Sequence, residues 1–106
     1  MPNIYGIKLD RAREMLRRAN WLPQPDASKD SNAHFHDDPS SVAFYMAHGL
    51  PEAEGCGVGL TGNLCGFAYN GKVGKLEVTT NNMQPSRAPG GKWDWPTVLA
   101  YDVNCR

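Results

Sequence analysis

The sequence predicts a small α+β domain in which one N-terminal helix packs on an antiparallel sheet of four or five strands, with two long loops. Three observations predict it. A helical stripe of apolar residues occurs near the N-terminus, strand-like alternation recurs in the second half, and runs rich in Pro, Gly, Asn and Asp separate these segments. With 106 residues and no internal repeat, the chain is expected to form a single domain, residues 1–106.

Residues 8–20 form the clearest predicted helix. Its apolar stripe, at helical spacing, consists of Leu9, Ala12, Leu16 and Ala19. The basic residues occupy the rest of the helix and are interpreted as a solvated face: Lys8, Arg11, Arg13, Arg17 and Arg18. Asn20 suits the left-handed residue that ends many helices, and Trp21 follows where a closing hydrophobic contact is common.

The middle of the chain predicts a loop, a strand and a hairpin. Residues 24–41 are polar and rich in Asp, Ser, Asn and Pro, which is typical of a long surface loop. The short apolar run 42–46 predicts a first strand. Residues 52–58 and 64–70 then predict the two arms of a hairpin.

The last third of the chain predicts two more strands around the second long loop. Residues 75–80 alternate cleanly between apolar and polar side chains. Residues 81–96 lose this periodicity and collect Pro, Gly and Asn, so a loop is expected. Residues 97–105 predict the final strand, with one face formed by Leu99, Tyr101, Val103 and Cys105.

Two of the three cysteines are expected to form a disulfide across the hairpin. If its turn centres on Leu60 and Thr61, Cys56 and Cys65 lie opposite each other, close enough to be bridged. Closing so short a loop stabilises a fold by roughly 2–3 kcal/mol. The alternative is two buried thiols. Cys105 is most simply a buried free thiol, although it could instead pair with one of the other two.

The net charge and the composition of the segments limit which partners and which cellular compartment are expected. Eleven basic and eleven acidic side chains cancel, so nucleic acid is not an expected partner. No apolar run approaches the ~20 residues of a membrane-spanning helix. The first residues lack a signal peptide. A disulfide favours an oxidising compartment, so we expect a periplasmic or secreted protein whose signal peptide has been removed, with a cytosolic protein as the alternative.

A histidine pair in the first long loop is the sharpest-looking motif. His34 and His36 alternate beside Asp37, a pattern that can bind zinc and that resembles the metal-binding run of metallo-β-lactamase-like hydrolases. Pro39 stands where that family has a further His, and the chain is too short for its fold. His48 could add a third ligand. We expect no metal and no cofactor, and keep His34 and His36 as weak metal candidates.

No catalytic constellation is visible. The hairpin glycines lack the Lys-Ser/Thr ending and the following helix of a phosphate loop. Ser40, Ser41 and Thr61 have no obvious partnered base. The chain is therefore not expected to be an enzyme.

The aromatic run in the second long loop is the best binding candidate, because Trp concentrates binding energy at interfaces. Alternation suggests that one of its two rings turns inward and the other outward, while the alternative is that both rings cover the core edge. The predicted partner-binding residues come from both long loops: Trp93, Asp94 and Trp95, together with Phe35, Asp37 and Asp38.

Much of the pattern resembles a family of small, largely uncharacterised exported proteins of Gram-negative bacteria. The matching residues are Tyr5-Gly6, Ala12-Arg13, Leu16, Asn20-Trp21-x-Pro23, Gly49-Leu50-Pro51-Glu52, Cys56, Gly57, Gly59, Cys65, Phe67, Tyr69, Leu76, Val78 and Thr80. The chain departs in Asn20 for the usual Gly, in its longer loops and in Cys105. The resemblance implies export to the periplasm and supplies no catalytic residues. The long loops suggest a member with its own partner.

Together these observations predict a non-catalytic periplasmic binding protein, most plausibly an inhibitor or immunity-type protein that neutralises a partner enzyme or toxin. Two alternatives stay open. One is a small metal-binding protein or enzyme that uses the His34/His36 loop. The other is a cell-envelope accessory module that binds peptidoglycan or another glycan through Trp93 and Trp95.

Overall fold

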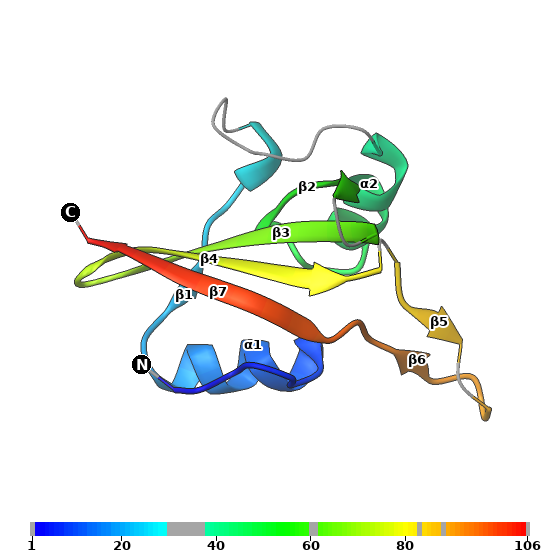
Figure 1. Cartoon of the computed structure of the whole chain (residues 1–106), viewed down its shortest axis with the longest axis horizontal. Helices are drawn as coiled ribbons and strands as arrows, with labels where there is room; N and C mark the ends of the chain where they lie inside the picture. Colours follow the sequence, from blue (N-terminus) through cyan, green and yellow to red (C-terminus); the bar gives the residue numbers. More distant parts are fainter. Residues whose placement is uncertain (1, 30–37, 60–61, 83, 88, 106) are drawn as a thin grey trace.

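The computed structural model describes residues 2–29, 38–59, 62–82, 84–87 and 89–105. Within them, two α-helices lie against one five-stranded antiparallel sheet, which confirms the predicted α+β class and the packing of the N-terminal helix on the sheet (Figure 1). The elements are α1 (Leu9–Arg18), β1 (Leu22–Pro23), the 3-10 helix η1 (Ala27–Lys29), α2 (Pro39–Ala47), β2 (Ala53–Gly59), β3 (Gly62–Gly71), β4 (Gly74–Asn81), β5 (Ser86–Arg87), β6 (Trp93–Asp94) and β7 (Val98–Cys105).

The sheet is built around β3 and β4, its two central strands. β4 pairs with β7 on one side and with β3 on the other, and both β1 and β2 pair along the remaining edge of β3. β5 and β6 pair only with each other. They form a small hairpin that projects from the end of the molecule where β7 begins (Figure 1). The predicted second loop therefore contains this hairpin.

Helix α1 forms where the sequence predicts it. Leu9, Ala12 and Leu16 are buried, as expected of the apolar stripe, but Ala19 is exposed, because the helix ends at Arg18 and Ala19 follows as its C-cap. Asn20 adopts the left-handed conformation with φ 66°, and the Trp21 N–H donates to the Leu16 carbonyl at 2.9 Å, which closes the helix end. The Trp21 ring packs so tightly on the end of β3 that a Cβ at Gly71 would lie 2.7 Å from it.

The strand predicted at 42–46 is wrong, because this run belongs to α2. The helix starts with Asp38, whose carboxylate accepts from the Ser41 N–H at 3.3 Å, and with Pro39 at the first helical position. Both are favoured helix starts. The buried residues Ser41 and Tyr45 are four positions apart, the spacing of one helix face. An apolar run of five residues is too short to distinguish helix from strand, so these start signals decide.

The predicted inner face of the last strand is only partly correct. Tyr101 and Val103 pack against the core, but Leu99 is 37% exposed and Val98 is buried in its place. The physical cause is an irregularity between β4 and β7, where consecutive residues of β4 pair with Ala100 and Val98 and so bulge β7 at Leu99. One inserted residue moves the following side chains to the opposite face. The side chain of Cys105 lies outside the described residues.

The predicted disulfide is confirmed. Cys56 and Cys65 face each other in the β2–β3 ladder, are bonded and are fully buried. The hairpin tip, residues 60–61, lies outside the described residues. The bond is compatible with an extracellular or periplasmic location. In the part of the chain described, no helix has the length and apolar character needed to cross a membrane.

Candidate functional site

The β5–β6 hairpin holds an arginine and a tryptophan in one fixed arrangement. Arg87 and Trp93 are opposite each other in the hairpin, and the Arg87 guanidinium lies 4.1 Å from the centre of the Trp93 ring. The same guanidinium donates to the Gly91 carbonyl at 2.8 Å. Gly90 and Gly91 have φ of +89° and +82°, which only glycine adopts without strain. The turn therefore depends on these two glycines, and it positions the carbonyl that fixes Arg87.

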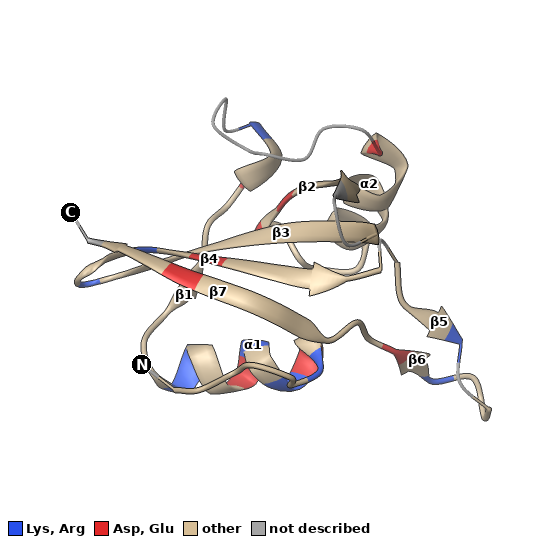
Figure 2. Cartoon of the chain, viewed as in Figure 1, with Lys and Arg blue, Asp and Glu red and all other residues tan. Residues whose placement is uncertain are grey.

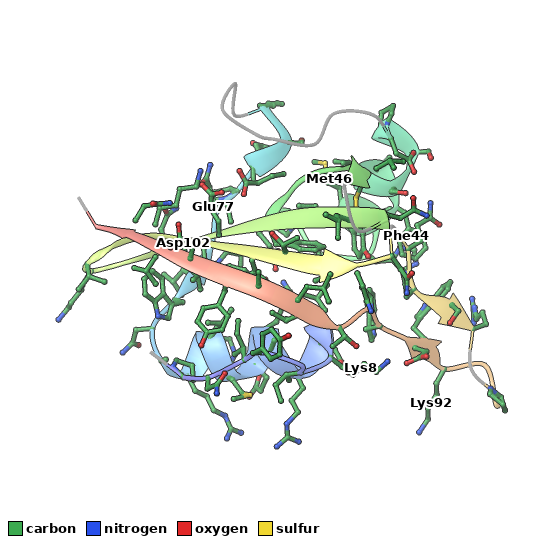
Figure 3. All side chains as sticks on the ribbon, in the orientation of Figure 1. Lys8, Phe44, Met46, Glu77, Lys92 and Asp102 are labelled. Carbon is green, nitrogen blue, oxygen red and sulfur yellow. A yellow bond between two sulfur atoms is a disulfide. The ribbon has the colours of Figure 1, made fainter. Side chains whose placement is uncertain are left out.

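Helix α2 packs against this hairpin through aromatic side chains. The Trp93 ring meets Phe44 edge-on at 5.3 Å and His48 edge-on at 5.6 Å between ring centres. Phe44 and His48 stack on each other at 4.0 Å, and His48 Nδ1 lies 2.8 Å from the Phe44 carbonyl, to which it donates. Figure 3 shows Phe44 at the end of the sheet from which the hairpin departs. We call Phe44, His48, Arg87 and Trp93 the aromatic cluster.

Trp95 links this cluster to the hydrophobic core. It packs against the core and lies 6.4 Å from Tyr45 and 6.5 Å from Trp93 between ring centres. Tyr45 is fully buried and meets Phe67 edge-on at 5.0 Å. The two tryptophans therefore differ: Trp95 closes the core, while Trp93 lies farther out among surface residues. Such edge-to-face contacts stabilise an aromatic group beyond its burial alone.

A cleft of about 390 Å³ lies beside the hairpin, and we call it the polar cleft. It is lined by residues from the start of β3, the end of β4, the hairpin and the segment that leads into β7, with Trp95 as its aromatic wall. At this cleft Lys8 and Asp94 form an ion pair of 2.9 Å, with each side chain about half exposed. The carboxylate of Asp94, a predicted partner-binding residue, is therefore already paired with Lys8.

A buried ion pair between Arg13 of α1 and Glu52 was not predicted from the sequence. Glu52 is fully buried, and both its oxygens accept from Arg13: Oε2 from Nε and Oε1 from Nη2 at 3.2 Å. Tyr69 donates its hydroxyl to Glu52 Oε2 at 3.0 Å, and Arg13 also reaches the Gly49 carbonyl at 3.3 Å. We call Arg13, Glu52 and Tyr69 the buried triad. It ties α1 to the start of β2 and to β3.

The protonation states of the triad follow from its geometry. Burial works against the charge of Arg13, but the hydrogen bond and charge of Glu52 outweigh it and raise the pKa of Arg13. Burial, and then the neighbouring Glu52 charge, raise the pKa of Tyr69 well above its usual range. Tyr69 therefore remains a protonated donor. Because both Glu52 oxygens are engaged, the arrangement suits a structural role.

One sequence signal could have exposed the triad. Arg13 lies four residues after Leu9 and one after Ala12, at the margin of the apolar stripe of α1. A charged residue there is half-buried when the stripe packs on a sheet, so it needs a buried partner of opposite sign. Treating all five basic residues of the helix as solvated hid this requirement.

Asp38 is the one remaining predicted site residue that lies among the described residues. The Asp38 carboxylate caps α2 and accepts from the hydroxyls of Ser40 and Ser41, each at 2.6 Å. These two hydrogen bonds lower the pKa of Asp38. The other residues of the first loop lie outside the described residues: His34, Phe35, His36 and Asp37. Among the residues that the structure describes, no group of three or more His, Cys, Asp and Glu is placed to hold a metal ion.

Comparison of the chain with family models, with curated proteins and with solved structures found no match. The resemblance to small exported proteins therefore stays a prediction. The fold and the site define a disulfide-bonded α+β domain with a projecting aromatic hairpin and an adjacent polar cleft.

Proposed function

We propose that this chain is a non-catalytic, exported binding protein that neutralises a partner enzyme or toxin, and that the β5–β6 hairpin is its contact surface. The observation that carries the proposal is the Arg87–Trp93 pair, held in one geometry on a hairpin that projects from the sheet (Figure 1). Trp and Arg are the residue types in which interfaces concentrate their binding energy.

The pair is organised before any partner arrives. Arg87 is fixed by its stack on Trp93 and by its hydrogen bond to Gly91, and Trp93 rests on Phe44 and His48. Ordering a long side chain at an interface costs about 0.5–1.5 kcal/mol. Since this cost has already been met during folding, more of the contact energy is available for affinity.

The charge of the hairpin indicates the kind of surface it fits. Asp94 is paired with Lys8, so Arg87 and Lys92 give the hairpin an excess of positive charge (Figure 2). Lys92 lies on the projecting part of the molecule (Figure 3). Complementary charge steers association and suppresses wrong partners. We therefore expect an acidic recess on the partner, of the kind that a narrow hairpin can enter.

A crosslinking experiment tests this proposal. A photo-crosslinking amino acid replaces Lys92 in one variant and Arg18 in a matched variant, since Arg18 lies at the far end of α1. Crosslinking is carried out in periplasmic extract of the source cells. A partner captured from position 92 and not from position 18 is then purified, and its own activity is measured with and without this protein.

Affinity measurements with the purified partner complete the test. Trp93→Ala and Arg87→Ala are each expected to weaken binding by about 30-fold or more, which corresponds to the 2 kcal/mol or more of an interface hot spot. Arg18→Ala is expected to bind like the wild type. Equal affinity of all three variants would rule out the hairpin as the contact surface. A partner whose activity is unchanged on binding would rule out neutralisation.

A further inference from the structure

We propose that the polar cleft binds an uncharged saccharide. This site goes beyond the proposed function, because it lies beside the hairpin and does not use the Arg87–Trp93 pair. The cleft has a volume of about 390 Å³, within the range of about 300–1,000 Å³ that is usual for small-molecule sites. Its lining combines amide side chains, one neutralised ion pair and an aromatic wall.

The amides of the cleft define the ligand's hydrogen-bonding chemistry. Four of them line it, one from the start of β3 and three from the end of β4 and the residues just after it: Asn63, Asn81, Asn82 and Gln84. Each amide offers two donors and an acceptor at one planar head. A ligand that is complementary to this surface must itself donate and accept hydrogen bonds at closely spaced positions. The hydroxyl groups of a sugar ring do both.

The charges of the cleft argue against an ionic ligand. Among the described residues that line the cleft, the charged side chains are Lys8 and Asp94, and they neutralise each other at 2.9 Å. A phosphate or carboxylate would have to compete with Asp94 for Lys8, and a cation would have to compete with Lys8 for Asp94. An uncharged ligand leaves this ion pair intact.

The aromatic wall provides the contact that a polyol needs besides its hydrogen bonds. Trp95 and Pro96 line the cleft, and Trp95 is held in place by Tyr45 and Trp93. A sugar ring has an apolar C–H face, which can lie on the indole while its hydroxyls face the amides.

The walls of the cleft are already fixed. The Asn81 side-chain oxygen accepts from the Thr97 N–H at 2.8 Å, and the Asn81 N–H donates to the Thr97 carbonyl at 3.0 Å. This bond sets the orientation of the Asn81 amide, so its NH2 group is the part that can face a ligand. The Asn82 N–H donates to the Asn63 carbonyl at 2.9 Å. Gln84 is anchored through its Nε2 to the Ser41 hydroxyl at 3.1 Å. A preformed site loses little entropy on binding.

A peptide fits these features less well. Extended peptides are bound chiefly by main-chain groups along a sheet edge, with side-chain pockets at alternate positions. Here the polar groups are side-chain amides arranged around one aromatic wall. The test below therefore treats peptide binding as an outcome against the proposal.

The experiment is an NMR titration of the full ¹⁵N-labelled chain with its disulfide intact. The probes are chitotriose, maltotriose, tri-alanine and inorganic phosphate, each added up to about 10 mM, which covers the millimolar affinities of a weak specific site. We expect one of the two sugars to shift the side-chain amide signals of Asn63 and Asn82 and the indole signal of Trp95. Tri-alanine and phosphate are expected to leave these signals unchanged.

Variants then locate the site. Asn63→Ala and Asn82→Gly, the latter chosen because Asn82 has φ 61°, are each expected to weaken sugar binding by about 5-fold or more, the value of one lost hydrogen bond. Asn104→Ala removes an exposed amide from β7 outside the cleft and is expected to bind like the wild type. Arg87→Ala, at a hairpin residue that does not line the cleft, is also expected to retain sugar binding, which separates this proposal from the hairpin proposal.

The remaining outcomes are defined in advance. No shift with either sugar, shifts that map to the hairpin tip, or binding of tri-alanine or phosphate in the cleft would each overturn the proposal. If a sugar binds, sedimentation with purified cell-wall sacculi distinguishes the source of the ligand. Co-sedimentation that is lost in Asn63→Ala indicates an envelope glycan, and its absence indicates a free sugar.

Discussion

Two arginines, Arg13 and Arg87, show how the molecule uses one residue type for opposite purposes. Arg13 is 70% buried and is bonded to a fully buried carboxylate between α1 and the sheet. Arg87 is exposed, lies on the face of Trp93 and is bonded to a carbonyl in its own hairpin. Both guanidinium groups are fixed in position, but only the first is enclosed by the fold.

The difference teaches that burial, and not the number of contacts, decides what each arginine stabilises. Removing Arg13 leaves the charge of Glu52 buried without its counterion, and an uncompensated buried charge is costly. Removing Arg87 leaves an indole ring exposed to water, which costs little. The triad region is therefore committed to stability, and the hairpin is free to serve binding. The following predictions test this division.

The largest expected effect is on the triad. Arg13→Ala is expected to lower the free energy of unfolding by about 3 kcal/mol, the lower end of the range for a broken buried pair, because Arg13 remains partly exposed. Chemical denaturation measures this. Arg18→Ala, which removes an exposed partner of Glu14 in the same helix, should change stability by less than about 0.5 kcal/mol. Equal losses in the two variants would contradict the assignment.

An apolar replacement sharpens the same point. Arg13→Met, Glu52→Leu and Tyr69→Phe combined remove every charge and hydroxyl of the buried triad. Replacing a buried ion pair by apolar residues of similar volume is often neutral or stabilising. We expect this triple variant to be more stable than Arg13→Ala alone, by about 1–3 kcal/mol. A triple variant that is less stable than Arg13→Ala would show that the triad contributes more than charge compensation.

The disulfide is a second contribution to the stability of the sheet, besides the buried triad. Replacing Cys56 and Cys65 by Ala together is expected to lower the free energy of unfolding by about 2–3 kcal/mol, as loop-closure entropy predicts for so short a loop. Reductant should destabilise the wild type by a similar amount and leave the double variant unaffected. A response of the double variant to reductant would point to a disulfide between two chains, because Cys105 is the one cysteine it retains.

Substitutions in the hairpin should lower stability much less than substitutions in the buried triad. Arg87→Ala is expected to lower the free energy of unfolding by about 0.5 kcal/mol, the value of an exposed cation–π contact. Trp93→Ala loses the contacts with Phe44 and His48 and is expected to cost about 1 kcal/mol. Thermal unfolding of both, measured beside Arg13→Ala, gives the comparison directly. Losses as large as that of Arg13→Ala would mean that the hairpin is part of the stabilising core.

Sequence reasoning found the elements whose signals are local and repeated. The structure agrees with the sequence at three of the four α1 stripe residues, at the Asn20 helix end and at the opposed Cys56 and Cys65, because each depends on periodicity or spacing within a few residues. The apolar run 42–46 does not reveal helix α2, because the deciding signal, Asp38 followed by Pro39, stands before this run.

The candidate site was predictable only in part. The sequence singled out Trp93 and Trp95 by composition, but it gave no reason to place Phe44, His48 or Arg87 around them. Those contacts join α2 to a hairpin about 40 residues later in the chain, and no local pattern encodes such a meeting. The bulge that turns Leu99 outward is equally non-local, because it depends on the register of β7 against β4.

The smallest predicted effect on stability concerns the start of α2, the helix whose Phe44 packs against the hairpin. Hydrogen bonds from Ser40 and Ser41 lower the pKa of Asp38 in the folded state below the ordinary value of 3.8. A lowered folded-state pKa stabilises the fold above the unfolded-state pKa, and this contribution disappears as pH falls through the folded-state pKa. The wild type should therefore lose stability below about pH 5 more steeply than Asp38→Asn, which keeps a capping side chain without a titrating charge.

The same cap also contacts the polar cleft. The Ser41 hydroxyl donates to Asp38 and accepts from Gln84, so the capped end of α2 is tied to the wall of the polar cleft. Unfolding curves of the wild type and Asp38→Asn at pH 7, 5, 4 and 3 measure the difference. Parallel curves would show that the charge of Asp38 adds nothing to the cap. Diverging curves would show that the hairpin and the cleft rest on a helix whose first turn is stabilised by a carboxylate.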